Sequence, residues 1–245
     1  MQAKRFLTAE WRFLAMLNYE VEPQALRSYL PYGTELDTWQ GRTYVSLVGF
    51  LFLDTRLLGL PLPFHRNFEE INLRFYVRRK VADGWRRGVV FVKEIVPRWA
   101  IATVARVVYN ENYVARPMRH SLQRDDNEPY ALRPDSQLEY SWREAGQWQS
   151  LRVTIAGAAA PLVPGSEAEF ITEHYWGYAA QRDGGGVEYQ VEHPPWLVWQ
   201  ASAATFECDV ARVYGARFVE PLQTSPASAF VAAGSPITVR RGVRI

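Results

Sequence analysis

Residues 69–79, with the sequence EEINLRFYVRR, decide the fold of this chain. Apolar side chains recur at every second position from Ile71 to Val77, and most residues between them are polar. Because successive side chains of a strand point to opposite faces of a sheet, this alternation predicts a β-strand. A turn signal at 82–84 returns the chain into a second strand at 85–95. Together the two segments predict an antiparallel hairpin.

Further strands are predicted on both sides of this hairpin. They are 43–53 after a turn signal at 36–42, a hairpin of 137–144 with 147–155, and the segments 187–192 and 235–245. The proline-broken segment 57–64 predicts an apolar crossover that covers one end of the sheet.

Only a few short helices interrupt the predicted strands. They are 23–30, where Pro23 suits the first turn, 99–109, and a helix from 167 to about 174 behind the capping box Ser166–Glu169. We therefore expect an α+β chain that is mainly antiparallel β. It forms one domain over residues 1–245, a barrel or strongly coiled sheet with short helices packed at its ends.

Composition excludes several classes of protein. Hydrophobic residues make up 48% and charged residues 22%, which excludes a disordered chain. Basic and acidic residues nearly balance at 28 to 26, and no basic run is present, so we expect no nucleic-acid partner. The longest apolar run, 44–53, is far shorter than the ~20 residues that span a bilayer, so we expect no membrane partner. One cysteine, Cys208, allows no internal disulfide, and the expected location is the cytoplasm.

Three polar residues of the deciding strand form the most informative pattern. Glu70, Asn72 and Arg74 are spaced two apart, so their side chains leave the same face. One interpretation is a solvated outer face, where these residues pair with neighbours. The other is the interior of a barrel, where a carboxylate, an amide and a guanidinium hold a small-molecule ligand and Glu70 acts as acid or base.

Lys93 lies in the apolar segment 89–95, on the strand paired with this polar stripe. A lysine in apolar surroundings loses proton affinity and becomes a nucleophile toward carbonyl groups. Since Lys4 is near the terminus and Lys80 near a turn, Lys93 is the candidate for a Schiff base. The alternative is a lysine that extends to solvent at a strand end.

Histidines and tyrosines supply the remaining candidates from the residues alone. His174 and Tyr175 follow the predicted helix at 167, His193 precedes two prolines, and we expect all three at the mouth of the pocket. The histidines match no compact metal motif, so no metal site is predicted. Gly184-Gly185-Gly186 has no phosphate-binding context, and no cofactor is predicted.

Several segments together resemble a known family. They are 67–78, 88–91, Ala105-Arg106 with 109–113, 174–178 and 193–196. These motifs, in this order over nearly the whole chain, resemble the YqjF-like family, a bacterial domain of unknown function with an acetoacetate decarboxylase-like fold. The resemblance implies a cone-shaped antiparallel β-barrel around a central pocket. Relatives of this fold often form homo-oligomers.

The resemblance also bears on the pocket residues. A strand glutamate of the decarboxylases matches Glu70. The stretch that corresponds to their nucleophilic lysine is Tyr109-Asn110-Glu111-Asn112-Tyr113, which contains no lysine. Tyr113, or the amides of Asn110 and Asn112, would instead give a neutral hydrogen-bonding site.

Three functional hypotheses follow. The first is a pocket for a small anionic or carbonyl-containing molecule, with proton-transfer or lyase chemistry at Glu70 and with Arg74 or Arg106 holding the anion. The second is a non-catalytic sensor or carrier with the same pocket. The third is an interaction protein whose exposed aromatic residues meet a partner.

Overall fold

The predicted hairpin lies at the centre of the observed sheet. In the computed structural model, which describes residues 3–61, 65–97 and 112–245, β5 (Phe68–Val81) and β6 (Gly84–Val96) pair in antiparallel register. Ile71, Leu73, Phe75 and Val77 are all fully buried on one face of β5. The alternation in the sequence therefore identified this strand and its faces.

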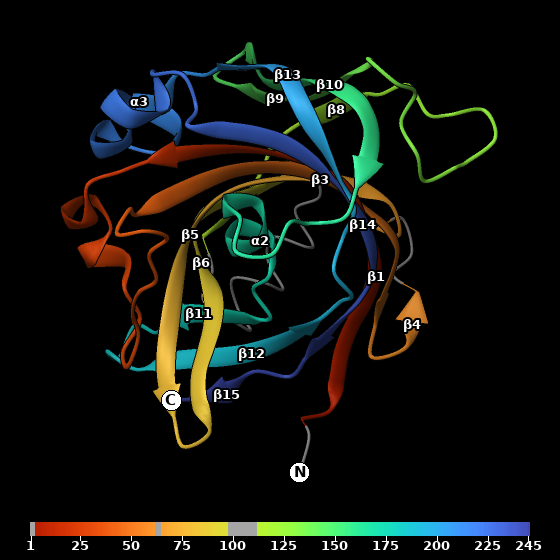
Figure 1. The fold of residues 1–245 in the computed structure, drawn as a ribbon. Coiled ribbons are helices and arrows are strands. Elements are labelled where there is room, and N and C mark those ends of the chain that lie inside the picture. The colour runs from red at the N-terminus through yellow and green to blue at the C-terminus, as the bar shows by residue number, and fades with distance from the viewer. Residues whose placement is uncertain (1–2, 62–64, 98–111) are drawn as a thin grey trace.

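Seven strands close into a ring (Figure 1). In spatial order they are β14 (Ser228–Arg240), β1 (Arg5–Glu20), β3 (Tyr44–Leu57), β5, β6, β11 (Trp176–Ala180) and β12 (Gly186–Glu192). A pairing of β12 with β14 completes the ring, and every join except the parallel one between β6 and β11 is antiparallel. The expected mainly antiparallel, barrel-like architecture is confirmed.

Four more strands continue the sheet outward from β14. They are β13 (Val198–Glu207), β10 (Gln147–Ala160), β9 (Gln137–Glu144) and β8 (Met118–Ser121). Short strands attach elsewhere: β2 (Glu35–Leu36), β4 (Leu60–Pro61), β7 (Tyr113–Ala115) and β15 (Val243–Arg244) pair with β5, β3, β6 and β12.

The ring wall separates two hydrophobic cores. Side chains from one face of β5 pack with Tyr140 and Trp142 of β9 and with Leu151 of β10, so the continuing sheet covers the outside of the ring. Side chains from the other face, including Phe68 and Tyr76, pack inside the ring with Phe170 and Trp196. Both faces of the ring strands are therefore shielded from bulk water, and a site on the inner face would be shielded as well.

Helix α2 (Glu167–Thr172) lies inside the outline of the ring (Figure 1). The hydroxyl of Ser166 accepts the backbone N–H of Glu169 at 3.2 Å, and the Glu169 carboxylate accepts the N–H of Gly165 at 2.7 Å. The predicted N-cap at Ser166 is therefore confirmed, but Glu169 bonds the N–H of Gly165 and not, as in a capping box, that of Ser166, and the helix ends two residues before His174. Its residues 170–172 are buried.

Other predictions of local structure need correction. Residues 23–30 form two 3₁₀ turns, Pro23–Ala25 and Arg27–Tyr29, instead of one α-helix. The backbone of Leu30 is extended, as the following Pro31 requires, so the segment is too short for an α-helix. Strands β1 and β13, the helices α3 (Val210–Val213) and α4 (Val219–Leu222), and the turn Ala216–Phe218 were not predicted.

The crossover predicted at 57–64 is partly a hairpin, because Leu57 ends β3 and Leu60–Pro61 pairs back on it. The C-terminal strand begins at Ser228, seven residues before the predicted start. The helix predicted at 99–109 lies outside the described residues.

None of the described helices is both long and apolar enough to span a bilayer.

Candidate functional site

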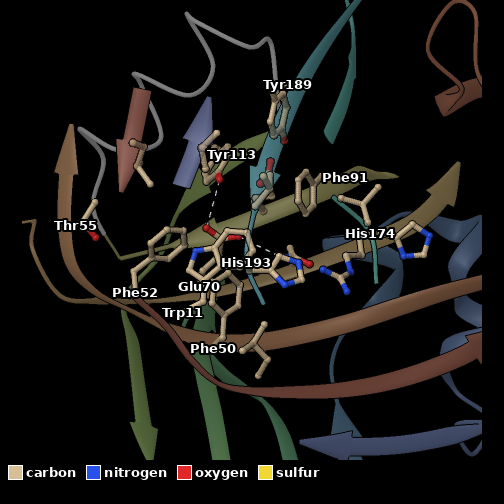
Figure 2. Close-up of a pocket in the computed structure, with 18 of the residues that line it drawn as sticks. Trp11, Phe50, Phe52, Thr55, Glu70, Phe91, Tyr113, His174, Tyr189 and His193 are labelled. Atoms are coloured by element: carbon tan, nitrogen blue, oxygen red, sulfur yellow. Dashed lines mark hydrogen bonds between the residues drawn. The ribbon is translucent and has the colours of Figure 1, made fainter. Parts of the chain in front are cut away.

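The inner face of the ring encloses a cavity of about 200 Å³ (Figure 2). Each ring strand contributes side chains to its lining: Trp11 of β1, Phe50 of β3, Glu70 of β5, Phe91 of β6, Trp176 of β11, Tyr189 of β12 and Val239 of β14. Most of the lining is apolar, and the polar groups come chiefly from β5 and its neighbours. A mostly apolar hollow with a few convergent polar groups is typical of a small-molecule site.

Glu70, Asn72 and Arg74 all line this cavity. Their exposed fractions are 3%, 2% and 7%, so the solvated outer face considered from the sequence does not exist. The Asn72 amide donates a hydrogen bond to Glu70 Oε1 at 3.0 Å, and the Tyr113 hydroxyl donates to Glu70 Oε2 at 3.4 Å (Figure 2). The glutamate is thus held in place between an amide and a phenol.

Arg74 is a buried cation. Its Nη2 donates to the carbonyl oxygen of Ile171 in α2 at 3.1 Å. Its Nε has no hydrogen-bond partner, and within the described part of the chain Arg74 forms no ion pair with a carboxylate. A buried guanidinium without a counter-charge is costly, because burial removes its hydration. Arg74 is therefore placed to receive an anionic group in the cavity.

Other cavity-lining residues carry buried polar atoms without partners among the described residues. These atoms are Asn72 Oδ1, Trp11 Nε1, Thr55 Oγ1 and His174 Nδ1. Native proteins leave few buried polar groups unsatisfied, and a cluster of them around one hollow is typical of a binding site.

His174 lies just after α2 at one end of the cavity. Its Nε2 is 3.7 Å from Asp37 Oδ2 and 3.4 Å from an Arg87 nitrogen, and Arg87 Nε donates to Asp37 at 2.6 Å. Burial lowers the pKa of His174 to about 4, with Arg87 and Arg74 acting in the same direction against Asp37. The imidazole is therefore neutral near pH 7.

Asp37 is a charged partner for this histidine. Burial alone would raise the pKa of Asp37, but the nearby His174 and the hydrogen bond and positive charge of Arg87 outweigh burial and lower the pKa.

His193 also lines the cavity, stacked between two aromatic rings. Its ring centroid lies 4.7 Å from that of Tyr175 and 4.2 Å from that of Trp196. Burial lowers the pKa of His193. Tyr175 does not reach the cavity, because it packs behind His193 and its hydroxyl donates to Glu173.

A register shift in β6 brings a second carboxylate into the site. Asn72 pairs with Glu94 and Leu73 with Lys93, but Arg74 pairs with Phe91, so Val92 is an extra residue. Through this bulge Phe91 and Glu94, three residues apart, both line the cavity. Glu94 is 1% exposed. No sequence pattern identified Glu94, because segment 89–95 is largely apolar and lacks the alternation that shows which residues face inward.

Lys93 does not line the cavity. Its register partner is Leu73, which faces the outer core, and its Nζ donates to the carbonyl oxygen of Val213. Burial lowers the pKa of Lys93, as expected for a half-buried lysine. The other two lysines, Lys4 and Lys80, are also described and also lie outside the lining. No lysine is therefore available in this cavity for a Schiff base.

The segment aligned with the decarboxylase lysine is only partly described. Tyr113 lines the cavity. Asn112 does not, because its amide donates to Val92 O at 3.0 Å and its carbonyl accepts the N–H of Glu94 at 3.1 Å. Arg106 and Asn110 lie outside the described residues.

Trp11 and Trp196 also line the cavity, and neither was predicted from the sequence to do so. Trp11 belongs to the unpredicted strand β1, and Trp196 follows the two prolines after β12. Trp196 lies in segment 193–196, one of those that carry the family resemblance, but no sequence pattern placed either tryptophan in a pocket. Within the described part of the chain, no group of three or more His, Cys, Asp or Glu side chains could hold a metal ion.

Comparison with known proteins agrees with this architecture. A model of the family DUF2071, described as an uncharacterized conserved protein, matches residues 8–236. The uncharacterized protein YqjF of Bacillus subtilis (strain 168) is 26% identical over 196 residues, which are 79% of this chain and 75% of YqjF.

Solved structures share the fold at low sequence identity. The enduracididine biosynthesis enzyme MppR complexed with pyruvate has a TM-score of 0.67 and 14% identity, over 100% of this chain and 91% of MppR. The acetoacetate decarboxylase of Legionella pneumophila has a TM-score of 0.67 and 13% identity, over 98% of this chain and 87% of the decarboxylase. These likenesses concern the fold.

Proposed function

The chain belongs to the DUF2071 family of uncharacterized conserved proteins, and from that premise we propose that its ring binds a small carboxylate-bearing, carbonyl-containing molecule. The buried Arg74, which has no counter-charge in the described part of the chain, carries this proposal. An anion at this position would supply the missing partner and form charge-assisted hydrogen bonds. The proposed location is the cytoplasm, and a homo-oligomer remains a prediction.

The carbonyl part of the proposal rests on the neighbours of Arg74. Asn72 and Tyr113 already hold Glu70, so the carboxylate is oriented toward whatever occupies the cavity. One structure with the same fold, MppR, is complexed with pyruvate, which supports an oxo acid as the class of ligand. An oxo acid held by Arg74 would place its carbonyl and the adjacent carbon in the part of the cavity that Glu70 lines.

The proposed chemistry is proton transfer at carbon. Glu70 would take a proton from the carbon next to the ligand carbonyl and return it, while a hydrogen-bond donor beside the carbonyl stabilises the enolate oxygen. Since no lysine lines the cavity, this chemistry proceeds without an imine. The alternative is a carrier or sensor that uses the same pocket and leaves the ligand unchanged.

Calorimetric titration with pyruvate and acetoacetate tests the binding. We expect Arg74→Gln to weaken binding at least tenfold, because it removes a charge-assisted contact. Arg78→Gln is the matched control, since Arg78 lies four residues further along β5 but pairs with Glu35 outside the cavity. Equal affinity in wild type and Arg74→Gln, or no binding by the wild type, would contradict the proposal.

Deuterium exchange into pyruvate distinguishes an enzyme from a non-catalytic carrier. Pyruvate in D₂O loses its methyl proton signal when a base removes those protons, and NMR follows the loss. An enzyme should accelerate this exchange and Glu70→Gln should abolish the acceleration. Binding without acceleration would instead support the carrier.

A further inference from the structure

We infer that the ligand of this cavity is an aryl oxo acid, with its carboxylate on Arg74 and its aromatic ring against a wall of four rings. These rings, called the aromatic wall below, are Trp11, Phe50, Phe52 and Phe68. The inference rests on the proposed function, because it assumes the anion site at Arg74. It adds the chemical class of the rest of the ligand.

The aromatic wall is a continuous surface. The Trp11 ring meets Phe50 and Phe52 edge to face, with centroids 5.5 and 5.8 Å apart, and Phe52 stacks on Phe68 at 4.7 Å. Phe50, Phe52 and Phe68 are each less than 10% exposed. Rings fixed in this way offer both faces and edges to a further ring, the two geometries that aromatic pairs prefer.

The aromatic wall begins beside the carboxylate of Glu70. In the register of β3 and β5, Phe50 lies opposite Glu70 and Phe52 opposite Phe68. Arg74 is four residues beyond Glu70 along β5, about 14 Å of strand at about 3.4 Å per residue. A three-carbon oxo acid on Arg74 would leave the wall uncovered, whereas an aryl group on the third carbon would extend toward it.

The indole of Trp11 favours a ring over an alkyl chain. Its Nε1 is buried and has no hydrogen-bond partner among the described residues. An alkyl chain would leave this N–H unsatisfied, but the π-face or a polar substituent of a bound ring can accept it. The aromatic wall therefore has a donor that an aromatic or substituted ligand can satisfy and an alkyl chain cannot.

Titration with three acids of matched head group tests the inference. The probes are pyruvate, phenylpyruvate and 2-oxooctanoate, which share the oxo acid and differ in the attached group. We expect phenylpyruvate to bind about tenfold to hundredfold more tightly than pyruvate, the range expected when a phenyl group is buried. We also expect it to bind at least threefold more tightly than 2-oxooctanoate. Equal affinity for phenylpyruvate and pyruvate, or tighter binding of 2-oxooctanoate, would overturn the inference and leave the anion site intact.

Variants of the aromatic wall test where the aromatic ring of the ligand binds. Phe52→Leu keeps an apolar side chain but removes an aromatic ring of the wall, so it should lower the preference for phenylpyruvate over 2-oxooctanoate. Phe206→Leu is the control, because Phe206 stacks on Trp142 outside the cavity. If Phe52→Leu unfolds, Phe50→Leu tests the same wall. An unchanged preference in a folded wall variant would place the ring elsewhere.

The anion site at Arg74 and the aryl class of the ligand can be tested separately. Arg74→Gln should weaken the binding of all three acids by a similar factor, since they share the carboxylate. If none of the three binds to the wild type, both the anion site and the aryl class are wrong.

Discussion

His174 shows how burial fixes the charge of a single residue. Its pKa falls from 6.5 to about 4, because the ring is enclosed by Tyr76 and Phe170 and faces the cations Arg87 and Arg74. Between these two pH values the unfolded chain binds a proton here and the folded chain does not. Stability therefore falls as the pH falls through this window.

We predict a loss of about 3 kcal/mol of unfolding free energy from His174 between pH 7 and pH 4, the equivalent of its pKa shift. Urea unfolding at several pH values measures it. His174→Asn should flatten the pH dependence in this window. His120→Asn is the control, because His120 is partly exposed, near Glu69 and outside the cavity. Equal slopes for wild type and His174→Asn would show that the histidine titrates normally.

Lys93 provides the test of imine chemistry. Because its amine points into the outer core and contacts Val213, pyruvate with sodium borohydride should leave no reduced adduct on the protein. Intact-mass spectrometry measures this, and Lys93→Met should bind oxo acids as the wild type does. An adduct that disappears in Lys93→Met would show that the lysine reaches a ligand.

The sequence predicted some of these residues and misplaced others for a physical reason. Glu70, Asn72 and Arg74 alternate with apolar residues, so their common face could be read directly. Lys93 and Glu94 lie in a strand with no such contrast, where a one-residue bulge sets which of them faces the cavity. A bulge depends on strand pairing, which a local pattern does not contain.

Helix α2 contacts Arg74 and forms part of the cavity lining. The carbonyl oxygen of Ile171 accepts a hydrogen bond from Arg74, and the side chain of Thr172 lines the cavity. The helix has only six residues, so its cap contributes much of its local stability. The capping box that predicted this helix therefore also positions the anion site.

We predict that Ser166→Ala lowers the unfolding free energy by about 1 kcal/mol, the typical effect of losing an N-cap. It should also weaken the binding of oxo acids, because Ile171 is held less firmly. Urea unfolding and calorimetry measure the two effects. Ser202→Ala on β13 is the control, since that exposed hydroxyl is remote from α2. An unchanged affinity would separate the helix from the site.

Strand β1 illustrates which elements the sequence hides. Most of its C-terminal half is buried on both faces, so the polar–apolar alternation that revealed β5 is absent there. By contrast, β9 and β10 join at a two-residue Ala145-Gly146 turn and were predicted correctly. Local patterns identified strands with distinct faces or tight turns, but they did not reveal β1, which packing covers on both faces, or β13, which is largely exposed and rich in alanine and serine.

At the scale of the whole molecule, β1 holds the ring together. It pairs with β14 on one side and β3 on the other along nearly its full length, so the two ends of the chain meet at this strand. A barrel was expected from the sequence, but the particular pairs that close it, β12 with β14 and the parallel join of β6 with β11, could not be read from the sequence, because both link distant segments.

Removal of residues 1–20 should therefore prevent folding, with loss of the cooperative thermal transition in circular dichroism. Removal of residues 241–245 is the matched control. It deletes only β15, which pairs with β12 through two residues, and should lower the melting temperature by a few degrees at most. A cooperative transition in the chain that lacks β1 would show that the ring closes without it.

The hairpin of β11 and β12 is the part of the ring with the shortest backbone joins. β11 meets β6 through two residue pairs, and β12 meets β14 through two. Ion pairs reinforce both sides, from Glu188 to Arg79 and Arg86, and from Glu192 to Arg240.

Because salt screens partly exposed ion pairs, ionic strength should loosen this hairpin before any other part of the ring. Trp176, Tyr189 and Val191 of the hairpin line the cavity, so loosening it would open a side route to the interior. Ligand association and dissociation would then both speed up in salt while the equilibrium affinity changed much less. Ion pairs of the β11–β12 hairpin would then control how fast a ligand enters and leaves the cavity.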